Sequence, residues 1–507
     1  MATRSAPLSG TVRPLVRALP AHVSPLSALA AVEREPHTLF LESSGPIASE
    51  ARWTLLAFDP AWRLEVRGGT LWRMEGGASS AISGHPMTAL AQAWPERIEY
   101  EEEWVGLPFV SGLAGFLSYD LKDHLERYPG RARRESSLPD LSLGFYDVIF
   151  AWDRERGEGW AVSTGLSAPD AASREERARA RLAAQWERVV AGGPVGPVTG
   201  APHGPRAELR SNFTREEYLR IVERALEHIA AGDIYQVNLA QRFRLEQAPS
   251  ASALFHALRA ESPAPFSSLF TTPGGGIVSS SPERFFTIDG DRIETRPIKG
   301  TRPRGANAAE DRALAAALHA SAKDRAENVM IVDLERNDLG RICEIGSVRV
   351  PSLCEVATYS NVHHLVSRVE GRLREDAGPV EVIRAMFPGG SITGAPKIRA
   401  IEIIDSLEPT RRGVYTGAIG YWDVSGTCDF NITIRTIVVE DGGASFHVGG
   451  GIVADSTPEG EYEETLVKAR GMMGALSALS EAGLMAPAPR EHDRGRLRGP
   501  NTLEEPA

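Results

Sequence analysis

We predict an α+β fold for this chain, and three features of the sequence are consistent with it. Short extended runs recur in both halves of the chain, between turns rich in glycine and proline. Stretches with helical periodicity lie between these runs. The sequence has no internal repeat.

Length and composition describe a globular protein of more than one ordinary domain, or one large composite domain. The chain has 507 residues, of which 42% are hydrophobic and 24% charged. Its net charge of −11 argues against a nucleic-acid partner, although a local basic pocket stays possible. No run of about 18 apolar residues is present, so we expect no membrane partner.

The chain contains three cysteines, Cys343, Cys354 and Cys428, and none belongs to a CxxC pair. An odd and sparse set favours a reducing compartment, so we expect a cytoplasmic protein with three free, buried thiols.

The N-terminal region, residues 1–190, begins with a stretch of 32 residues that lacks Asp and Glu. It resembles a transit peptide only weakly, because Pro14, Pro20 and Pro25 would break an amphipathic helix. We expect a frayed start, extended runs at 38–41, 53–57 and 145–152, and a helix over 170–190. Residues 191–211 are expected to form a linker or loop, since 191–205 hold five glycines and four prolines.

The second region, residues 212–480, begins with a predicted helix over 212–231, where Thr214 and Glu217 form a capping box. We expect a long helix over 310–338, a final helix over 458–479 and a disordered tail over 481–507. The other predicted elements are a helix over 252–259, a hairpin over 284–293, and strands over 235–243, 362–370, 418–422, 430–439 and 445–448.

A lysine, Lys299, directly precedes Gly300 and Thr301. Glycine allows a sharp turn close to a ligand, and burial lowers the pKa of a lysine, which makes its amine a nucleophile or base. Spacing alone favours the alternative, an exposed lysine at a strand end.

Acidic residues recur at helical spacing in two separate helices. Glu461, Glu464 and Lys468 share one helix face, and Asp324 shares another with Glu327. Two carboxylates from separate helices would suit Mg²⁺. On spacing alone, Glu464 and Lys468 are more often a surface ion pair.

Glycine and histidine clusters give weaker signals. The run Gly449, Gly450 and Gly451 either presents backbone N–H groups to an anion or makes a turn. Side chains alternate along a strand, so at most one of His363 and His364 points into a site. No nucleotide-binding, nucleophile-elbow or zinc-protease motif is present.

Taken together, these stretches resemble the chorismate-utilising enzymes and, within them, the aminodeoxychorismate synthase component I group. The matching runs fall in order over residues 210–475: DIYQVNLAQRF (233–243), SPERF (281–285), PIKGT (297–301), IVDLERNDL (331–339), FPGGSITGAPK (387–397), IVADS (452–456) and the helix with Glu461, Glu464 and Lys468. The resemblance implies two facing, mainly antiparallel β-sheets flanked by helices, with strands from both halves of the chain.

Three positions favour this group over its relatives. Anthranilate synthases usually have alanine where Lys299 stands, and isochorismate and salicylate synthases have a water-activating lysine where this chain has Gln236. The run GGSIT before Gly394 also resembles the group. Anthranilate synthase component I stays the alternative, and a chorismate- or tryptophan-binding subunit without turnover is a second one.

The resemblance implies a mechanism in which Lys299 attacks C2 of chorismate while Glu283 protonates the leaving C4 hydroxyl. Ammonia then adds at C4 and expels Lys299. Mg²⁺ would be held by Glu327 and Glu464. The resemblance assigns the remaining site residues as follows: Asp324 and Glu461 hold metal waters, His364 backs the ring, Tyr415, Arg435, Gly449, Gly450 and Gly451 hold the enolpyruvyl carboxylate, and Gly300, Thr301 and Lys468 lie at the ring carboxylate.

Two binding partners follow from the resemblance. Such enzymes receive ammonia from glutamine, and this chain has no convincing glutaminase cysteine, so we expect a separate glutamine amidotransferase subunit. A tryptophan pocket would be formed by Leu41, Glu42, Ser43 and Arg52 together with Pro265, Phe266 and Ser267. A filled-in core at that place is the alternative.

Overall fold

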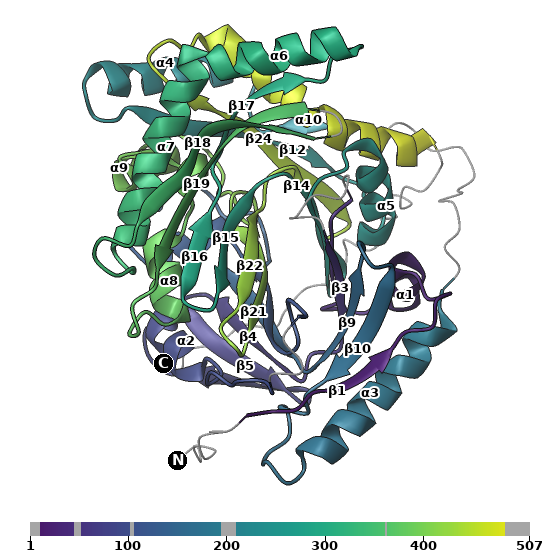
Figure 1. The fold of residues 1–507 in the computed structure, drawn as a ribbon. Coiled ribbons are helices and arrows are strands. Elements are labelled where there is room, and N and C mark those ends of the chain that lie inside the picture. The colour runs from purple at the N-terminus through teal and green to yellow at the C-terminus, as the bar shows by residue number, and fades with distance from the viewer. Residues whose placement is uncertain (1–10, 45–51, 102–105, 194–208, 360–361, 482–507) are drawn as a thin grey trace, which may run out of the picture.

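The computed structural model describes residues 11–44, 52–101, 106–193, 209–359 and 362–481. The first ten residues, most of the predicted linker and the predicted tail from residue 482 lie outside this part. Within it, the chain forms two antiparallel sheets of 12 strands each, and both sheets take strands from both halves of the chain (Figure 1). The predicted fold class is therefore confirmed.

The first sheet carries the strands that later frame one side of the site. Its order is β1 (Leu15–Ala18), β10 (Glu158–Ser163), β9 (Val148–Asp153), β3 (Trp53–Ala57), β2 (Leu39–Glu42), β13 (Phe266–Thr272), β14 (Gly275–Ser281), β23 (Thr436–Glu440), β24 (Gly443–Ile452), β12 (Gln236–Leu245) and β11 (Arg210–Ser211), with β20 (Gly394–Ala395) also paired to β12.

The second sheet frames the other side. Its order is β17 (Ile298–Pro303), β19 (Val362–Arg372), β16 (Arg292–Thr295), β15 (Arg284–Asp289), β22 (Cys428–Ile432), β21 (Ala418–Asp423), β7 (Gly112–Leu117), β8 (Leu141–Tyr146), β4 (Trp62–Arg67), β5 (Thr70–Glu75) and β6 (Ala78–Ile82), with β18 (Arg349–Thr358) also paired to β19.

Helices cover the outer faces of the sheets. They are α1 (Pro25–Val32), α2 (Pro86–Ala93), α3 (Arg174–Ala191), α4 (Arg215–Ala230), α5 (Ala251–Glu261), α6 (Ala308–Ala320), α7 (Ala322–Gly340), α8 (Pro379–Met386), α9 (Lys397–Leu407) and α10 (Pro458–Glu481), with the short 3₁₀ turns η2 (Tyr119–His124) and η3 (Gly390–Ile392). Helices α1, α3, α5 and α10 pack on the first sheet, and α2, α7 and α8 pack on the second. No helix of the described part is long and apolar enough to cross a membrane.

The inner layer between the sheets is apolar. Phe270 and Ile277 of the first sheet pack in one cluster with Phe116, Ile419 and Tyr421 of the second. All three cysteines are free and buried, as predicted, and burial raises the pKa of Cys343 to about 11. The interior therefore offers no activated thiol.

Most predicted elements are present. The capping box of α4 forms in full, because the Thr214 hydroxyl accepts from the Glu217 N–H and the Glu217 carboxylate accepts from the Thr214 N–H. The expectation of a frayed start is wrong for the described residues of that stretch, because β1 joins the first sheet. Pro25 does not break a helix but begins α1, where Ser24 provides the N-cap.

Three predicted elements are each split into two. Residues 145–152 and 430–439 were predicted as single strands, but in each case the chain passes from the second sheet to the first, at Asp147 and near Arg435. Strand-forming residues continue through both crossings, so the pattern does not reveal them. The predicted helix 310–338 breaks at Ser321, whose hydroxyl caps α7 by accepting from the Asp324 N–H at 3.3 Å.

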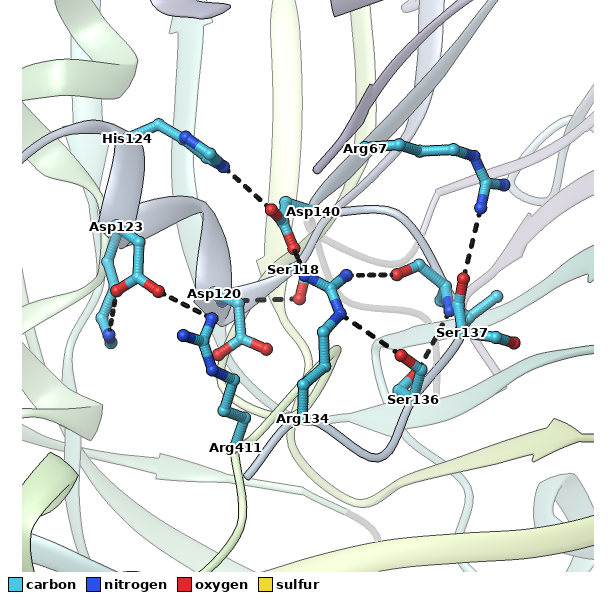
Figure 2. A network of polar contacts seen from close by, with 12 residues as sticks. Arg67, Ser118, Asp120, Asp123, His124, Arg134, Ser136, Ser137, Asp140 and Arg411 are labelled. Atoms are coloured by element: carbon cyan, nitrogen blue, oxygen red, sulfur yellow. Dashed lines mark hydrogen bonds and ion pairs between the residues drawn. The ribbon is translucent and has the colours of Figure 1, made fainter. Parts of the chain in front are cut away.

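A polar network fixes the long connection that includes η2 (Figure 2). Asp140 accepts from Arg134 and contacts His124, each at 2.8 Å. Asp123 accepts from Arg411, which follows α9, at 2.7 Å. These contacts tie the N-terminal half of the chain to the loop that continues into Arg412.

Candidate active site

Lys299 lies on β17 beside a bulge. The pairing of β17 with β19 is irregular between Lys299 and Thr301, and Gly300 between them has a φ of +74°. A glycine in this left-handed conformation lets the strand bulge, which redirects the neighbouring side chains. The Lys299 amine donates to the backbone carbonyl of Ser391 in η3 at 3.0 Å.

Lys299 and Glu283 shift each other's surroundings away from those of exposed groups. Burial lowers the pKa of Lys299, against the opposing effect of Glu283 and Glu327. Burial raises the pKa of Glu283, whose side chain is buried, and Ser391 and Lys299 act in the opposite sense. Both shifts favour the neutral form, which is what a nucleophilic amine and a general acid need.

Two carboxylates from separate helices face this pair. Burial raises the pKa of Glu327 on α7, and the negative charges of Asp324 and Glu464 add to the effect. Glu464 on α10 pairs with Lys468 at 2.7 Å; although burial acts to raise the pKa of Glu464, this lysine and others leave it lowered. The predicted ion pair between Glu464 and Lys468 therefore forms beside the site.

Glu461 lies one turn before Glu464 and is buried. One of its oxygens accepts from the Ser456 hydroxyl at 2.6 Å, and the other has no hydrogen-bond partner among the described residues. That second oxygen would lie 2.7 Å from a Cβ on Gly450. Asp324 is occupied differently, because it accepts from Arg302 at 2.9 Å.

These acidic residues fit a hard divalent cation. Among the described residues no three His, Cys, Asp or Glu side chains converge as metal ligands. Mg²⁺ needs fewer from the protein, since it is usually held by one or two carboxylates, with waters and ligand oxygens completing the shell. Glu327 and Glu464 supply two carboxylates, and the unpartnered oxygen of Glu461 can accept from a metal-bound water.

The three glycines lie within β24 and do not form a turn. The pairing of β24 with β23 ends at Phe446, whereas its pairing with β12 continues to Ile452. The Gly449 carbonyl accepts from Lys468 at 2.9 Å, so it points away from β12. The N–H groups of Gly449 and Gly451 point to the same side, because N–H and C=O of one strand residue share an edge. They are available to an anion there.

The two histidines of β19 point in different directions, as predicted. His363 contacts Asp311 and Thr358, whereas His364 contacts the Thr301 hydroxyl at 2.9 Å. Burial, with the nearby charge of Arg435, lowers the pKa of His364 to about 4. His364 is therefore a neutral imidazole at neutral pH.

Arg435 and Tyr415 approach from the second sheet. Burial lowers the pKa of Arg435, and its guanidinium forms no ion pair within the described part of the chain. An unpaired, desolvated arginine favours an anionic ligand. Tyr415 is stacked on His447 with ring centroids 5.0 Å apart and lies near Arg412, so its described contacts are with residues outside the Lys299 cluster.

A second cavity of about 130 Å³ lies between the sheets. Its lining includes every residue predicted for the tryptophan pocket: Ser43, Arg52, Pro265, Phe266 and Ser267. Arg52 is paired with Asp153, and Arg284 makes two hydrogen bonds to Asp429 in the same wall. The cavity is small beside ordinary ligand pockets of about 300 Å³ or more.

Sequence reasoning did not assign a role to Ser391 or Asn238. The Ser391 carbonyl accepts from the Asn238 side chain at 3.1 Å as well as from Lys299. Gln236, on the same face of β12, is fully buried, and neither polar atom of its side chain has a partner among the described residues. A backbone carbonyl carries no signal in the residue type, so only the fold reveals this contact.

The chain is similar to proteins that act on chorismate. The family model for chorismate binding enzymes matches residues 43–474. An aminodeoxychorismate synthase of Streptomyces griseus is 40% identical over 440 residues, which span 86% of this chain and 58% of the relative. Anthranilate synthase component 1 of Thermus thermophilus is 42% identical over 397 residues, which span 77% of this chain and 84% of the relative.

The fold is that of a solved relative. Anthranilate synthase component I from Streptococcus pneumoniae superposes with a TM-score of 0.74 and 30% identity, over 83% of this chain and 92% of that one. The two sequence identities, 40% and 42%, are too close to separate the two kinds of relative.

Proposed function

This chain belongs to the chorismate-binding enzymes, and we propose that it is the chorismate-aminating component of an aminodeoxychorismate synthase. The observation that carries the proposal is Lys299: its amine is desolvated, its pKa is lowered, and it lies beside a buried glutamic acid with a raised pKa. A protein that only binds chorismate would need neither a nucleophile nor an acid in this arrangement.

In the proposed reaction the Lys299 nitrogen attacks C2 of chorismate and the ring double bonds shift. The C4–O bond breaks, and Glu283 gives its proton to the departing oxygen, which leaves as water. Ammonia then forms a bond to C4, the double bonds shift back and the C2–N bond to Lys299 breaks. The product is 4-amino-4-deoxychorismate, a precursor of 4-aminobenzoate and folate, and pyruvate is retained because no base removes the C2 proton. Two displacements give net retention at C4.

The surrounding groups suit a substrate with two carboxylates. Glu327 and Glu464 would hold Mg²⁺, which acts as a Lewis acid toward the ring carboxylate. Arg435 and the N–H groups of Gly449 and Gly451 would take the enolpyruvyl carboxylate. Thr301 and Lys468 lie where they can complete the charge balance, and neutral His364 would back the ring near the leaving hydroxyl. For Tyr415 we keep the proposed contact with the enolpyruvyl group.

Ammonia would come from a separate glutamine amidotransferase subunit. The three thiols of this chain are buried, and the pKa values of Cys343 and Cys428 are raised by burial, which is the opposite of a glutaminase nucleophile. The chain spans 58% of its Streptomyces griseus relative, so that longer protein contains sequence with no counterpart here.

The cavity between the sheets is a proposed tryptophan site. Its lining combines apolar walls with Ser43, Asn431 and charged groups. Tryptophan should then raise the melting temperature with a concentration dependence set by mass action, whereas phenylalanine should not. An unchanged melting temperature with tryptophan would favour a filled-in core.

The deciding experiment incubates the protein with chorismate, Mg²⁺ and an ammonium salt and identifies the product. We expect an aminated compound that yields 4-aminobenzoate only after a lyase is added, and a chorismate adduct on Lys299 detectable by mass spectrometry. Fluorescent anthranilate with pyruvate would instead establish anthranilate synthase. Lys299→Ala should lower 4-amination by more than about 10³-fold, and unchanged turnover would contradict the covalent route.

A further inference from the structure

The Gly390–Ile392 turn, η3, is the structure on which Lys299 rests. Its middle residue, Ser391, accepts from the Lys299 amine at 3.0 Å and from Asn238 at 3.1 Å through one carbonyl oxygen. The position of that oxygen therefore determines where the amine lies relative to Glu283.

Two buried charged residues hold the turn at its two ends. The Glu335 carboxyl on α7 accepts from the Gly390 N–H at 3.1 Å. Arg412 donates to the Ile392 carbonyl at 3.1 Å and is itself fixed by Glu408 at 2.6 Å and 2.9 Å. Glu335 and Arg412 are each about 3% exposed.

Glu335 has no direct contact with the proposed reacting groups and would otherwise be an unexplained buried acid. Its second oxygen lacks a partner among the described residues, and a Cβ on Gly390 would lie 3.0 Å from the first oxygen. Nearby Lys397 pairs with Asp338 at 2.5 Å instead. A buried acid is costly, so its one hydrogen bond to the turn is the contact that accounts for it.

We propose that Glu335 is a positioning residue, which fixes the Gly390–Ile392 turn so that the Ser391 carbonyl holds the Lys299 amine in its reactive place. This inference rests on the proposed role of Lys299. Loss of the contact should let the turn shift, and a misplacement of about 1 Å is enough to cost about 10²-fold in rate.

The test compares Glu335→Gln with Glu335→Leu. Burial and Asp338 raise the pKa of Glu335 to about 8, so glutamine is a close mimic of its neutral form and can still accept from the Gly390 N–H. Leucine has a similar volume but no acceptor. Val332→Ala, which removes core packing from the same helix, is the control for lost stability alone.

The first readout is acetylation of Lys299 by an amine-reactive ester across a pH series, quantified by peptide mass spectrometry. We expect Glu335→Leu to move the half-labelling pH upward by about one unit, the usual spread of lysine pKa values in folded proteins. Glu335→Gln and Val332→Ala should label like the parent protein. Because no chorismate is present, this readout stands even if the proposed reaction is wrong.

The second readout is steady-state amination. Glu335→Leu should lower kcat about 10²-fold with little change in KM for chorismate, and Glu335→Gln should restore most of it. Labelling of Glu335→Leu that matches the parent protein, with a rate loss no larger than that of Val332→Ala, would overturn the proposal.

Discussion

Gly300 packs against Asp324 so closely that a Cβ on the glycine would lie 2.9 Å from the aspartate side chain. The same Cβ would lie 2.9 Å from Leu318, and the backbone φ of +74° disfavours any other residue. The bulge that directs Lys299 therefore depends on the absence of a side chain at this position.

Gly300→Ala should lower stability by about 3 kcal/mol, the sum of left-handed backbone strain and overpacking, and should abolish most of the activity. Urea unfolding and ammonium-dependent turnover measure the two effects. Gly290→Ala is the matched control, because Gly290 has a φ of +64° but open space around the added Cβ. That control should cost only about 1 kcal/mol, the strain alone. Equal effects from the two substitutions would show that the close contact is unimportant.

The pKa shifts of Glu283 and Lys299 predict a narrow pH profile for adduct formation, measured in single-turnover experiments without ammonia. Reaction needs a protonated acid and a neutral amine, so the two limbs report the pKa values of this pair. Burial raises one value and lowers the other. The acid limb should therefore lie above the value of about 4.3 for free glutamate, and the alkaline limb below about 10.4 for free lysine.

Glu283→Gln should slow adduct formation and remove the limb that belongs to the acid. Limbs at or outside the values of the free amino acids would contradict the desolvated pair. Because the profile is measured on the adduct, it does not depend on which product follows.

The two metal carboxylates can be tested through the Mg²⁺ requirement. Glu327→Gln and Glu464→Gln should each raise the Mg²⁺ concentration for half-maximal activity by more than about tenfold, the smaller loss seen when only an outer-shell partner is removed. Glu463→Gln is the control, since Glu463 is an exposed neighbour of Glu464 on α10. A metal requirement that is unchanged in all three variants would remove Glu327 and Glu464 from the site.

The sequence was informative where chemistry depends on residue type at fixed spacing. The face shared by Glu461 and Glu464, the glycine beside Lys299 and the alternation of His363 and His364 all follow from local geometry, and the structure has them in those forms. The sheet-to-sheet crossings near Asp147 and Arg435 were missed, because a strand that changes sheets keeps the same residue pattern.

Contacts through the backbone could not be predicted from residue types. The Ser391 carbonyl that holds Lys299, and the Gly390 N–H that meets Glu335, belong to groups that every residue has. The run Gly449–Gly451 was ambiguous for a related reason, since glycine permits turns and close strand packing alike. Only the pairing with β12 shows that the run is a strand.

Lys299 should also lower the stability of the folded protein, and this effect has a defined dependence on pH. Its folded-state pKa is lowered by burial, so between that value and about 10.4 the unfolded chain binds more protons, and stability rises with pH across this window. Lys299→Met removes the buried amine and should raise the melting temperature at neutral pH. The gain should shrink as pH approaches 10.4 and vanish above it. Lys323→Met, at a lysine that is 53% exposed, should change little at any pH. A Lys299→Met protein less stable than the parent at neutral pH would mean that the attraction of Glu283 and Glu327 exceeds the cost of burial.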